Sequence, residues 1–193
     1  MRRFLCFLLV VLTFAATPSA SADPAPEPGS AQARYRHAYD AIHKKQWAEA
    51  RAILIDLWSR SRTYDVAASL GQVEYQLANY APAAEYMAFA VANVPPKESP
   101  ANVERYQRAL VELRKLVGTL RVGVNPPGAT VRLDGKALSD FVPGQEIFVA
   151  PGAHTLEAEH DGRTTTLKVS LGAGEQRSVE LDVVRDVPLA GAP

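Results

Sequence analysis

Cysteine is nearly absent from this 193-residue sequence, in which Cys6 is the only one. A single thiol excludes a disulfide framework within the chain and a zinc site built from several thiolates. Long apolar runs are also missing: the longest, residues 4–16, is too short to cross a bilayer, which takes about 20 residues. Charge of one sign is not in excess, because 21 basic side chains face 21 acidic ones. We therefore expect no nucleic-acid partner.

The first 22 residues have the three-part layout of an export signal. Met1-Arg2-Arg3 precedes the apolar run, and the small residues Ala20-Ser21-Ala22 follow it. This layout predicts a signal peptide over 1–22 that is cleaved after Ala22, with a retained N-terminal anchor as the alternative. Removing 1–22 takes two of the 21 basic residues and none of the 21 acidic ones, which leaves a formal charge of −2 and no cysteine. We expect an exported protein of the periplasm or cell envelope, with no transmembrane segment in the mature chain.

The remaining chain divides by composition. Residues 23–30 hold three prolines and a glycine, so we expect a disordered linker. Residues 31–117 have apolar positions at helical spacing, and residues 119–184 alternate with the period of strands. Gly118 marks the boundary as a helix terminator, and residues 185–193 form a flexible tail. The order predicts a two-unit fold, helical and then all-β, in which each unit folds separately.

The helical half contains a repeat. Gln46-Trp47-Ala48-Glu49-Ala50 and Asn79-Tyr80-Ala81-Pro82-Ala83 share an aromatic residue at a bend, and the aromatics are 33 residues apart. Each motif lies between two amphipathic stretches, which predicts two antiparallel helical hairpins. The predicted helices cover 31–45, 48–60, 65–78 and 82–93.

A fifth helix is signalled by Ser99-Pro100, an N-cap followed by proline at the first helical position. One stripe of this helix is apolar: Val103, Tyr106, Leu110, Leu113 and Val117. The opposite face is charged: Glu104, Arg105, Arg108, Glu112 and Arg114. This division is typical of a terminal capping helix, with one face for the preceding hairpin and one for water.

The second hairpin resembles a tetratricopeptide repeat, on the strength of Leu70-Gly71, Tyr80, Ala83, Ala90 and Pro95. The first hairpin keeps Trp47 and Ala50 but has Ala38 where the glycine would be, and Leu57 where a small residue would be. The resemblance implies a protein or peptide partner, held on the concave surface that the first helix of each hairpin lines.

On those two helices the resemblance directs attention to one set of side chains at helical spacing: Tyr35, Tyr39, His43, Gln72, Tyr75 and Gln76. The alternative is that the tyrosines pack against neighbouring helices. Because two repeats are few for a stable array, we also expect that the capping helix or self-association supplies the missing burial.

The β half has about six short alternating runs separated by Asp-Gly and Pro-Gly turns, which predicts a small antiparallel sandwich. It resembles the PEGA domain in Pro127-Gly128-Ala129, in Asp134-Gly135 and in Pro151-Gly152-Ala153-His154. It departs from that pattern at residues 139–143, which stand in a longer loop. The resemblance implies an accessory module of the cell envelope and no particular mechanism.

Signals of catalysis are missing. The sequence has no Gly-x-Ser-x-Gly, and Gly172-Ala173-Gly174 lacks the lysine and following helix of a phosphate loop. No pair of histidines has metal-binding spacing, so we expect no enzyme, metal or cofactor.

We expect a protein-binding or scaffold protein, in which the β domain docks or positions what the helices hold. The alternative is a cell-wall glycan-binding or surface-layer-associated module with helices for spacing or self-association. The β half offers only Phe141 and Phe148 as aromatics for such a site, which favours the first hypothesis.

Overall fold

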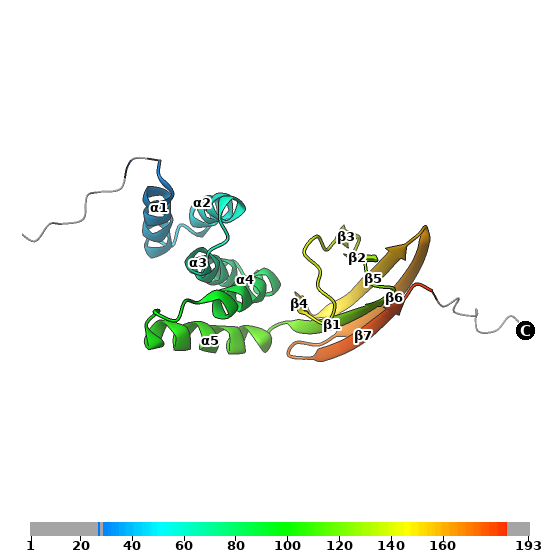
Figure 1. The fold of residues 1–193 in the computed structure, drawn as a ribbon. Helices are drawn as coiled ribbons and strands as arrows, with labels where there is room; N and C mark the ends of the chain where they lie inside the picture. Colours follow the sequence, from blue (N-terminus) through cyan, green and yellow to red (C-terminus); the bar gives the residue numbers. More distant parts are fainter. Residues whose placement is uncertain (1–26, 28, 185–193) are drawn as a thin grey trace, which may run out of the picture.

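A computed structural model describes Glu27 and residues 29–184. The predicted signal peptide at 1–22, most of the predicted linker and the predicted tail at 185–193 lie outside the described residues. Within them, helices come first and strands follow, as expected, and the two groups form neighbouring units (Figure 1). No helix in the described part of the chain combines the length and the apolar character needed to cross a membrane.

The helical unit consists of α1 (Ala31–His43), α2 (Trp47–Arg60), α3 (Tyr64–Gln76), α4 (Tyr80–Asn93) and α5 (Pro100–Arg114). Side-chain caps explain two of the starts. The Ser30 hydroxyl accepts a hydrogen bond from the backbone N–H of Ala33 at 3.1 Å, and that of Ser99 accepts one from Asn102 at 3.3 Å. Pro100 follows Ser99 at the first position of α5, as predicted.

The repeat is visible in the backbone itself. Helices α1 and α3 begin at residues 31 and 64 and end at 43 and 76, while α2 and α4 begin at 47 and 80 and end at 60 and 93. Every bound therefore shifts by 33 residues. Lys45 and Ala78, one repeat apart, both adopt the left-handed conformation, with φ of 59° and 60°. The first hairpin thus has the geometry of the second despite its departures in sequence.

Buried contacts hold the hairpins together. Gly71 of α3 packs so closely on α4 that a Cβ there would lie 3.2 Å from the carbonyl oxygen of Ala83. The carboxylate of Glu74, 1% exposed, accepts hydrogen bonds from Arg51 of α2 and Asn79, each at 2.7 Å. One buried acid therefore joins α2, α3 and the turn before α4, and its desolvation is offset by two donors.

Helix α5 ends earlier than predicted. It stops at Arg114, and Gly118 is the first residue of β1 rather than a helix cap. Gly118 is also absent from the glycines with positive φ, so left-handed termination is not its role. A Cβ on Gly118 would lie 2.8 Å from Cβ of Leu171, and this close approach explains the glycine.

The β unit consists of β1 (Gly118–Asn125), β2 (Thr130–Leu133), β3 (Lys136–Ala137), β4 (Glu146–Val149), β5 (Gly152–His160), β6 (Arg163–Leu171) and β7 (Gln176–Asp182). These strands form a three-stranded sheet in the order β4-β1-β7 and a four-stranded sheet in the order β3-β2-β5-β6. The sandwich is confirmed, with one difference from the prediction: β1 and β7 pair in parallel. The first and last strands are joined through the rest of the unit, so no hairpin forces them to be antiparallel.

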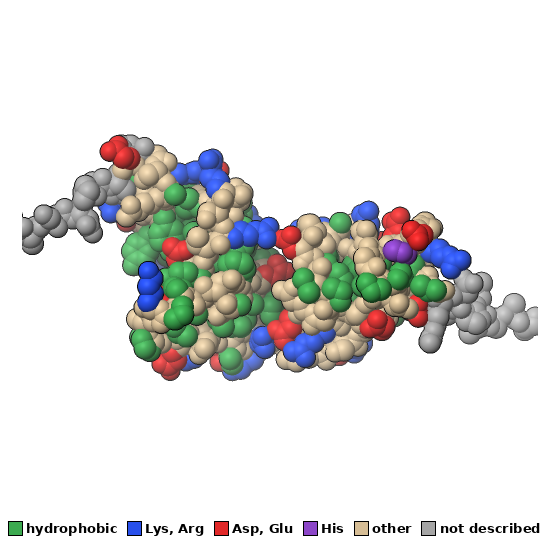
Figure 2. All heavy atoms as spheres, viewed as in Figure 1, with side chains coloured by type: hydrophobic (Ala, Val, Ile, Leu, Met, Phe, Trp, Pro, Cys, Tyr) green, Lys and Arg blue, Asp and Glu red, His purple; other side chains and the backbone are tan. Residues whose placement is uncertain are grey.

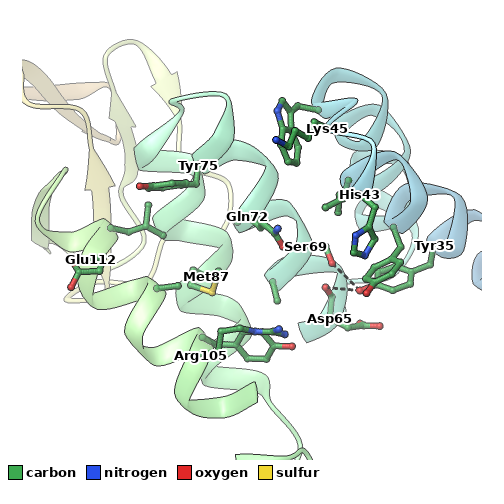
Figure 3. A pocket seen from close by; sticks show the side chains of 18 residues that line it. Tyr35, His43, Lys45, Asp65, Ser69, Gln72, Tyr75, Met87, Arg105 and Glu112 are labelled. Carbon is green, nitrogen blue, oxygen red and sulfur yellow. Dashed lines mark hydrogen bonds between the residues drawn. The ribbon is translucent and has the colours of Figure 1, made fainter. Parts of the chain in front are cut away.

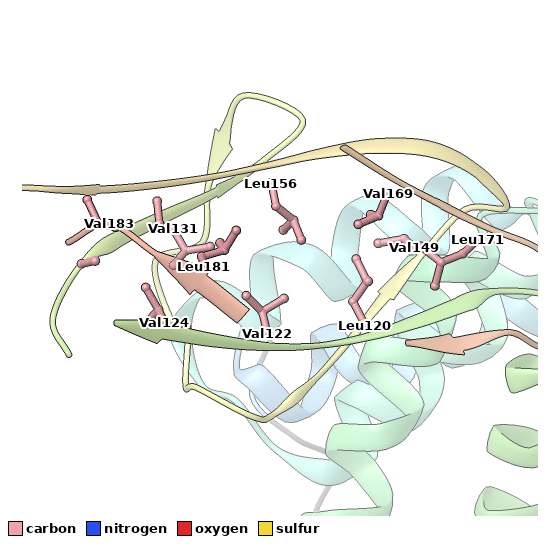
Figure 4. Close-up of a cluster of buried hydrophobic side chains, with 12 residues drawn as sticks. Leu120, Val122, Val124, Val131, Val149, Leu156, Val169, Leu171, Leu181 and Val183 are labelled. Carbon is pink, nitrogen blue, oxygen red and sulfur yellow. The ribbon is translucent and has the colours of Figure 1, made fainter. Parts of the chain in front are cut away.

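Between the two sheets lies the core of the β unit (Figure 4). Leu120, Leu156 and Leu181 are fully buried there. Two of the predicted turn motifs meet at the edge of this core. Asp134 accepts a hydrogen bond from the backbone N–H of Thr155 at 2.8 Å, and its other oxygen lies 2.7 Å from Nδ1 of His154. The Asp-Gly turn is thereby fixed to the start of β5.

Candidate functional site

A groove of about 630 Å³ runs along the helical unit (Figure 3). Its walls come from α1, α3 and α5, the first helices of successive hairpins and the helix that follows them. Lys45 of the α1–α2 turn, Trp47 at the start of α2 and Met87 of α4 also contribute to its lining. Because α1 and α3 are equivalent in the repeat, they present equivalent faces to the same side of the array.

Five of the six predicted site residues line this groove. They are Tyr35, Tyr39, His43, Gln72 and Tyr75. Gln76 does not line it, although it is exposed at the last position of α3. Tyr75 is the last residue of α3 that lines the groove, and Gln76 follows it at the end of the helix.

Tyr35 is part of the helix packing as well as the groove wall. Its hydroxyl lies 2.8 Å from the Ser69 hydroxyl and donates to the backbone carbonyl of Asp65 at 3.3 Å, which ties α1 to α3. Burial raises the pKa of this phenol above its usual value, so the group stays neutral. For Tyr35 the packing interpretation holds, because it is half-buried and packs against the buried cluster that contains Ala38, Leu54 and Leu70.

Tyr39 and Tyr75 differ from Tyr35. They are 53% and 45% exposed, whereas Tyr35 is half-buried. The ring of Tyr39 meets that of His43 edge-on, with the ring centroids 4.4 Å apart. The rings of Tyr75 and Tyr80 are tilted to each other, with their centroids 5.7 Å apart. These contacts orient the two rings without burying them, so both tyrosines remain available from the groove.

The third wall, α5, was not predicted as part of the site. Arg105 and Glu112, assigned from the sequence to a water-facing surface, line the groove together with Tyr106. The Arg105 guanidinium lies 5.3 Å from the centre of the Tyr106 ring, a cation–π distance. The sequence could have indicated this wall. A helix that follows two hairpins takes the place of the first helix of a third hairpin, so it continues the face that α1 and α3 form.

Charges in the groove are of both signs. Glu112 pairs with Lys115 at 2.7 Å. Among the described residues, Lys45 and Arg105 have no carboxylate at ion-pair distance. The groove therefore combines exposed tyrosines, an amide and charged ends of side chains, which can bind another molecule by ring contacts and hydrogen bonds. Nowhere in the described ranges do three His, Cys, Asp or Glu side chains gather to hold a metal ion.

No protein-family model and no curated protein matches this sequence. The chain is similar in structure to a tetratricopeptide repeat domain protein from Salinibacter ruber, solved by solution NMR. The similarity covers 47% of this chain and 93% of that one, with 16% identity and a TM-score of 0.41. The 33-residue offset between hairpins is a property of this chain and does not depend on that likeness.

Proposed function

We propose that this protein is a non-enzymatic binding or scaffold protein, whose tetratricopeptide-like array holds a segment of a protein or peptide partner in the groove between α1, α3 and α5. The observation that carries the proposal is the exposure of Tyr39 and Tyr75 on adjacent walls of one groove. An exposed aromatic ring gains burial only when another molecule covers it.

The composition of the groove supports a polypeptide as the ligand. Tyrosine and arginine are enriched among the residues that contribute most to protein binding, because they combine a large contact area with hydrogen bonding. Tyr39, Tyr75 and Arg105 supply these groups, and Gln72 adds an amide that can donate to and accept from a peptide backbone.

Export to the periplasm or cell envelope belongs to the same proposal. Its support is the layout of residues 1–22. The PEGA-like β unit would then act as an accessory module next to the array, docking or positioning what the helices hold.

The glycan-binding alternative finds less support. Stacking on a sugar needs exposed aromatic rings, and the β unit offers Phe141 and Phe148. Phe148 is 4% exposed and packs against helices, while Phe141 is half-buried against the core of the sandwich. Retention of the intact chain on isolated peptidoglycan, with loss of retention on Phe141→Ala, would favour the alternative.

The test of the proposal is a double variant, Tyr39→Ala with Tyr75→Ala, compared with Val111→Ala as a control. Val111 is an equally exposed apolar residue on α5, at 54%, outside the groove. Partners cross-linked to the mature chain in native envelopes are identified first, and their affinities are then measured with purified proteins.

The double variant should keep its free energy of unfolding within about 1 kcal/mol, as is usual for exposed sites. Its affinity for the partner should fall at least about 30-fold, since binding hot spots exceed 2 kcal/mol. The control should change neither quantity. Unaltered affinity in the double variant, or a loss of several kcal/mol of stability, would remove these tyrosines from the site.

A further inference from the structure

The helical array ends in an unusual way. Each hairpin of such an array covers the apolar face of its neighbour, and the last helix needs a cap. Helix α5 stands where the first helix of a third hairpin would stand, because it packs on α4 and contributes to the same groove as α1 and α3. Only three residues separate its last residue, Arg114, from β1, so no second helix completes a third hairpin.

Phe148 of β4 fills the position next to α4 and α5. It lies in a buried cluster whose other members all belong to the two helices or the junction that follows them: Ala83, Ala84, Met87, Leu110, Leu113 and Val117. Its neighbours in the strand, Ile147 and Val149, face the opposite way, into the core of the sandwich. Strand β4 therefore carries one apolar face for each unit.

Charged groups surround this contact. Glu146 accepts hydrogen bonds from Arg114 of α5 at 2.5 Å and from Arg121 of β1 at 2.8 Å. The Arg114 guanidinium also lies 5.8 Å from the centre of the Phe148 ring. Because the Glu146 carboxylate is only 19% exposed, pairing with two guanidinium groups offsets much of its desolvation.

Two loops of the β unit add further contacts. The backbone N–H of Gly174, in the turn between β6 and β7, donates to the carbonyl of Val117 at 2.8 Å. In the loop between β3 and β4, Asp140 pairs with Arg62 of the α2–α3 connection at 2.7 Å. Acidic and basic side chains meet at this junction in Figure 2. The exposed Arg62–Asp140 pair contributes little stability. It does show that the loop at residues 139–143, which departs from the PEGA pattern, lies next to the α2–α3 connection.

From this geometry we propose that the β unit is the cap of the helical array, taking the place of the second helix of a third hairpin. Phe148 is the side chain that does so, and Glu146 positions Arg114 beside it. One member of the cluster, Leu113, also lines the groove, and α5 carries Arg105 and Tyr106 into it. The cap therefore holds one wall of the groove in place. It also covers the array end that would otherwise favour self-association.

Hydrogen exchange of the intact chain tests this cap, with Phe148→Ala compared with Phe141→Ala. Both changes remove a phenylalanine ring from the β unit, but Phe141 packs against the core of the sandwich and is not a member of the cluster that contains Phe148. Phe148→Ala should speed amide exchange in α5 at least about tenfold while α1, at the far end of the array, keeps its protection. Phe141→Ala should leave α5 unchanged.

Unchanged exchange in α5 of a folded Phe148→Ala chain would overturn the proposal, as would an equal effect of both variants on α5. If Phe148→Ala does not fold, Glu146→Gln provides the second variant, since it keeps the shape of the side chain and weakens its pairing with Arg114. It should give a smaller increase in exchange that is again confined to α5 and the residues up to Val117. No increase there would refute the cap. These outcomes need no partner, so they are independent of the proposed binding function.

Discussion

Replacing Gly118 by alanine tests how closely the two sheets approach where β1 leaves the helical unit. A Cβ at this position would lie 2.8 Å from Cβ of Leu171 and 3.1 Å from Cγ2 of Val149. Both neighbours are buried in the core of the sandwich. The Leu171 atom is attached directly to the backbone, so it cannot move aside by changing rotamer, and the strands themselves must separate.

The size of the effect follows from two opposing contributions. Overpacking a buried site costs about 1–3 kcal/mol. Replacing glycine by alanine at an allowed backbone conformation restores about 0.4–1 kcal/mol by restricting the unfolded chain. Gly118→Ala should therefore lower the free energy of unfolding by about 1–2 kcal/mol. In a chain of this length that lowers Tm by roughly 2–8 °C.

Gly123→Ala is the matched control, because it makes the same change in the same strand. The three atoms nearest to a Cβ there all belong to the end of the Glu180 side chain, which is flexible and exposed and can move into solvent. This variant should have an unchanged free energy of unfolding or one raised by up to about 1 kcal/mol, because restriction of the unfolded chain is not opposed by overpacking. Urea unfolding followed by circular dichroism measures both differences. Equal destabilisation by the two variants would refute the steric reasoning.

Two further predictions concern polar contacts. Burial lowers the pKa of His154, but the hydrogen bonds of His154 to Asp134 and to the carbonyl of Ala150 outweigh burial and raise this pKa above 6.5. The same hydrogen bond to His154 lowers the pKa of Asp134 below 3.8. The pair therefore stabilises the fold most between about pH 4 and 6.5, and the stability that it adds is lost as pH rises through the raised pKa of His154. The difference in unfolding free energy between the natural chain and His154→Gln, measured by urea unfolding, should shrink from pH 5.5 to pH 8, and a difference that grows would contradict this assignment. Glu74→Ala should lower the free energy of unfolding by about 2–3 kcal/mol, because Arg51 and Asn79 lose a charged acceptor. Thermal unfolding of this variant that matches the natural chain would show that the fold does not need these hydrogen bonds.

The helical half could be predicted well because its signals are local. Apolar spacing, the capping serine before Pro100 and the 33-residue repeat all lie within single helices or adjacent ones, and each expected helix is present. The groove could be predicted in part, because helical spacing fixes the face of α1 on which Tyr39 lies and the face of α3 on which Tyr75 lies. Gln76 was predicted with the same stripe, but the part of α3 that lines the groove ends at Tyr75.

Pairing between distant segments was harder to predict. Nothing in the local pattern of β1 or β7 indicates a parallel pair, because alternation along a strand is the same for either direction. The contact between Asp134 and His154 likewise depends on β2 pairing with β5, which brings together two turn motifs about 20 residues apart. Such contacts depend on topology more than on composition.

The position of Phe148 could have been inferred from the sequence. Strand β4 reads Ile147-Phe148-Val149, three consecutive apolar residues in a unit whose other strands mostly alternate. Because successive side chains on a strand point to opposite faces, such a run requires both faces to be covered. The sandwich covers Ile147 and Val149, so Phe148 needs a second partner. The apolar stripe of α5, with Leu110 and Leu113, packs on α4, and Phe148 joins the cluster that these residues form with Val117 of the junction. The helical unit and the β unit thus each supply one side of this contact. The path of the chain through Gly118 brings the two sides together.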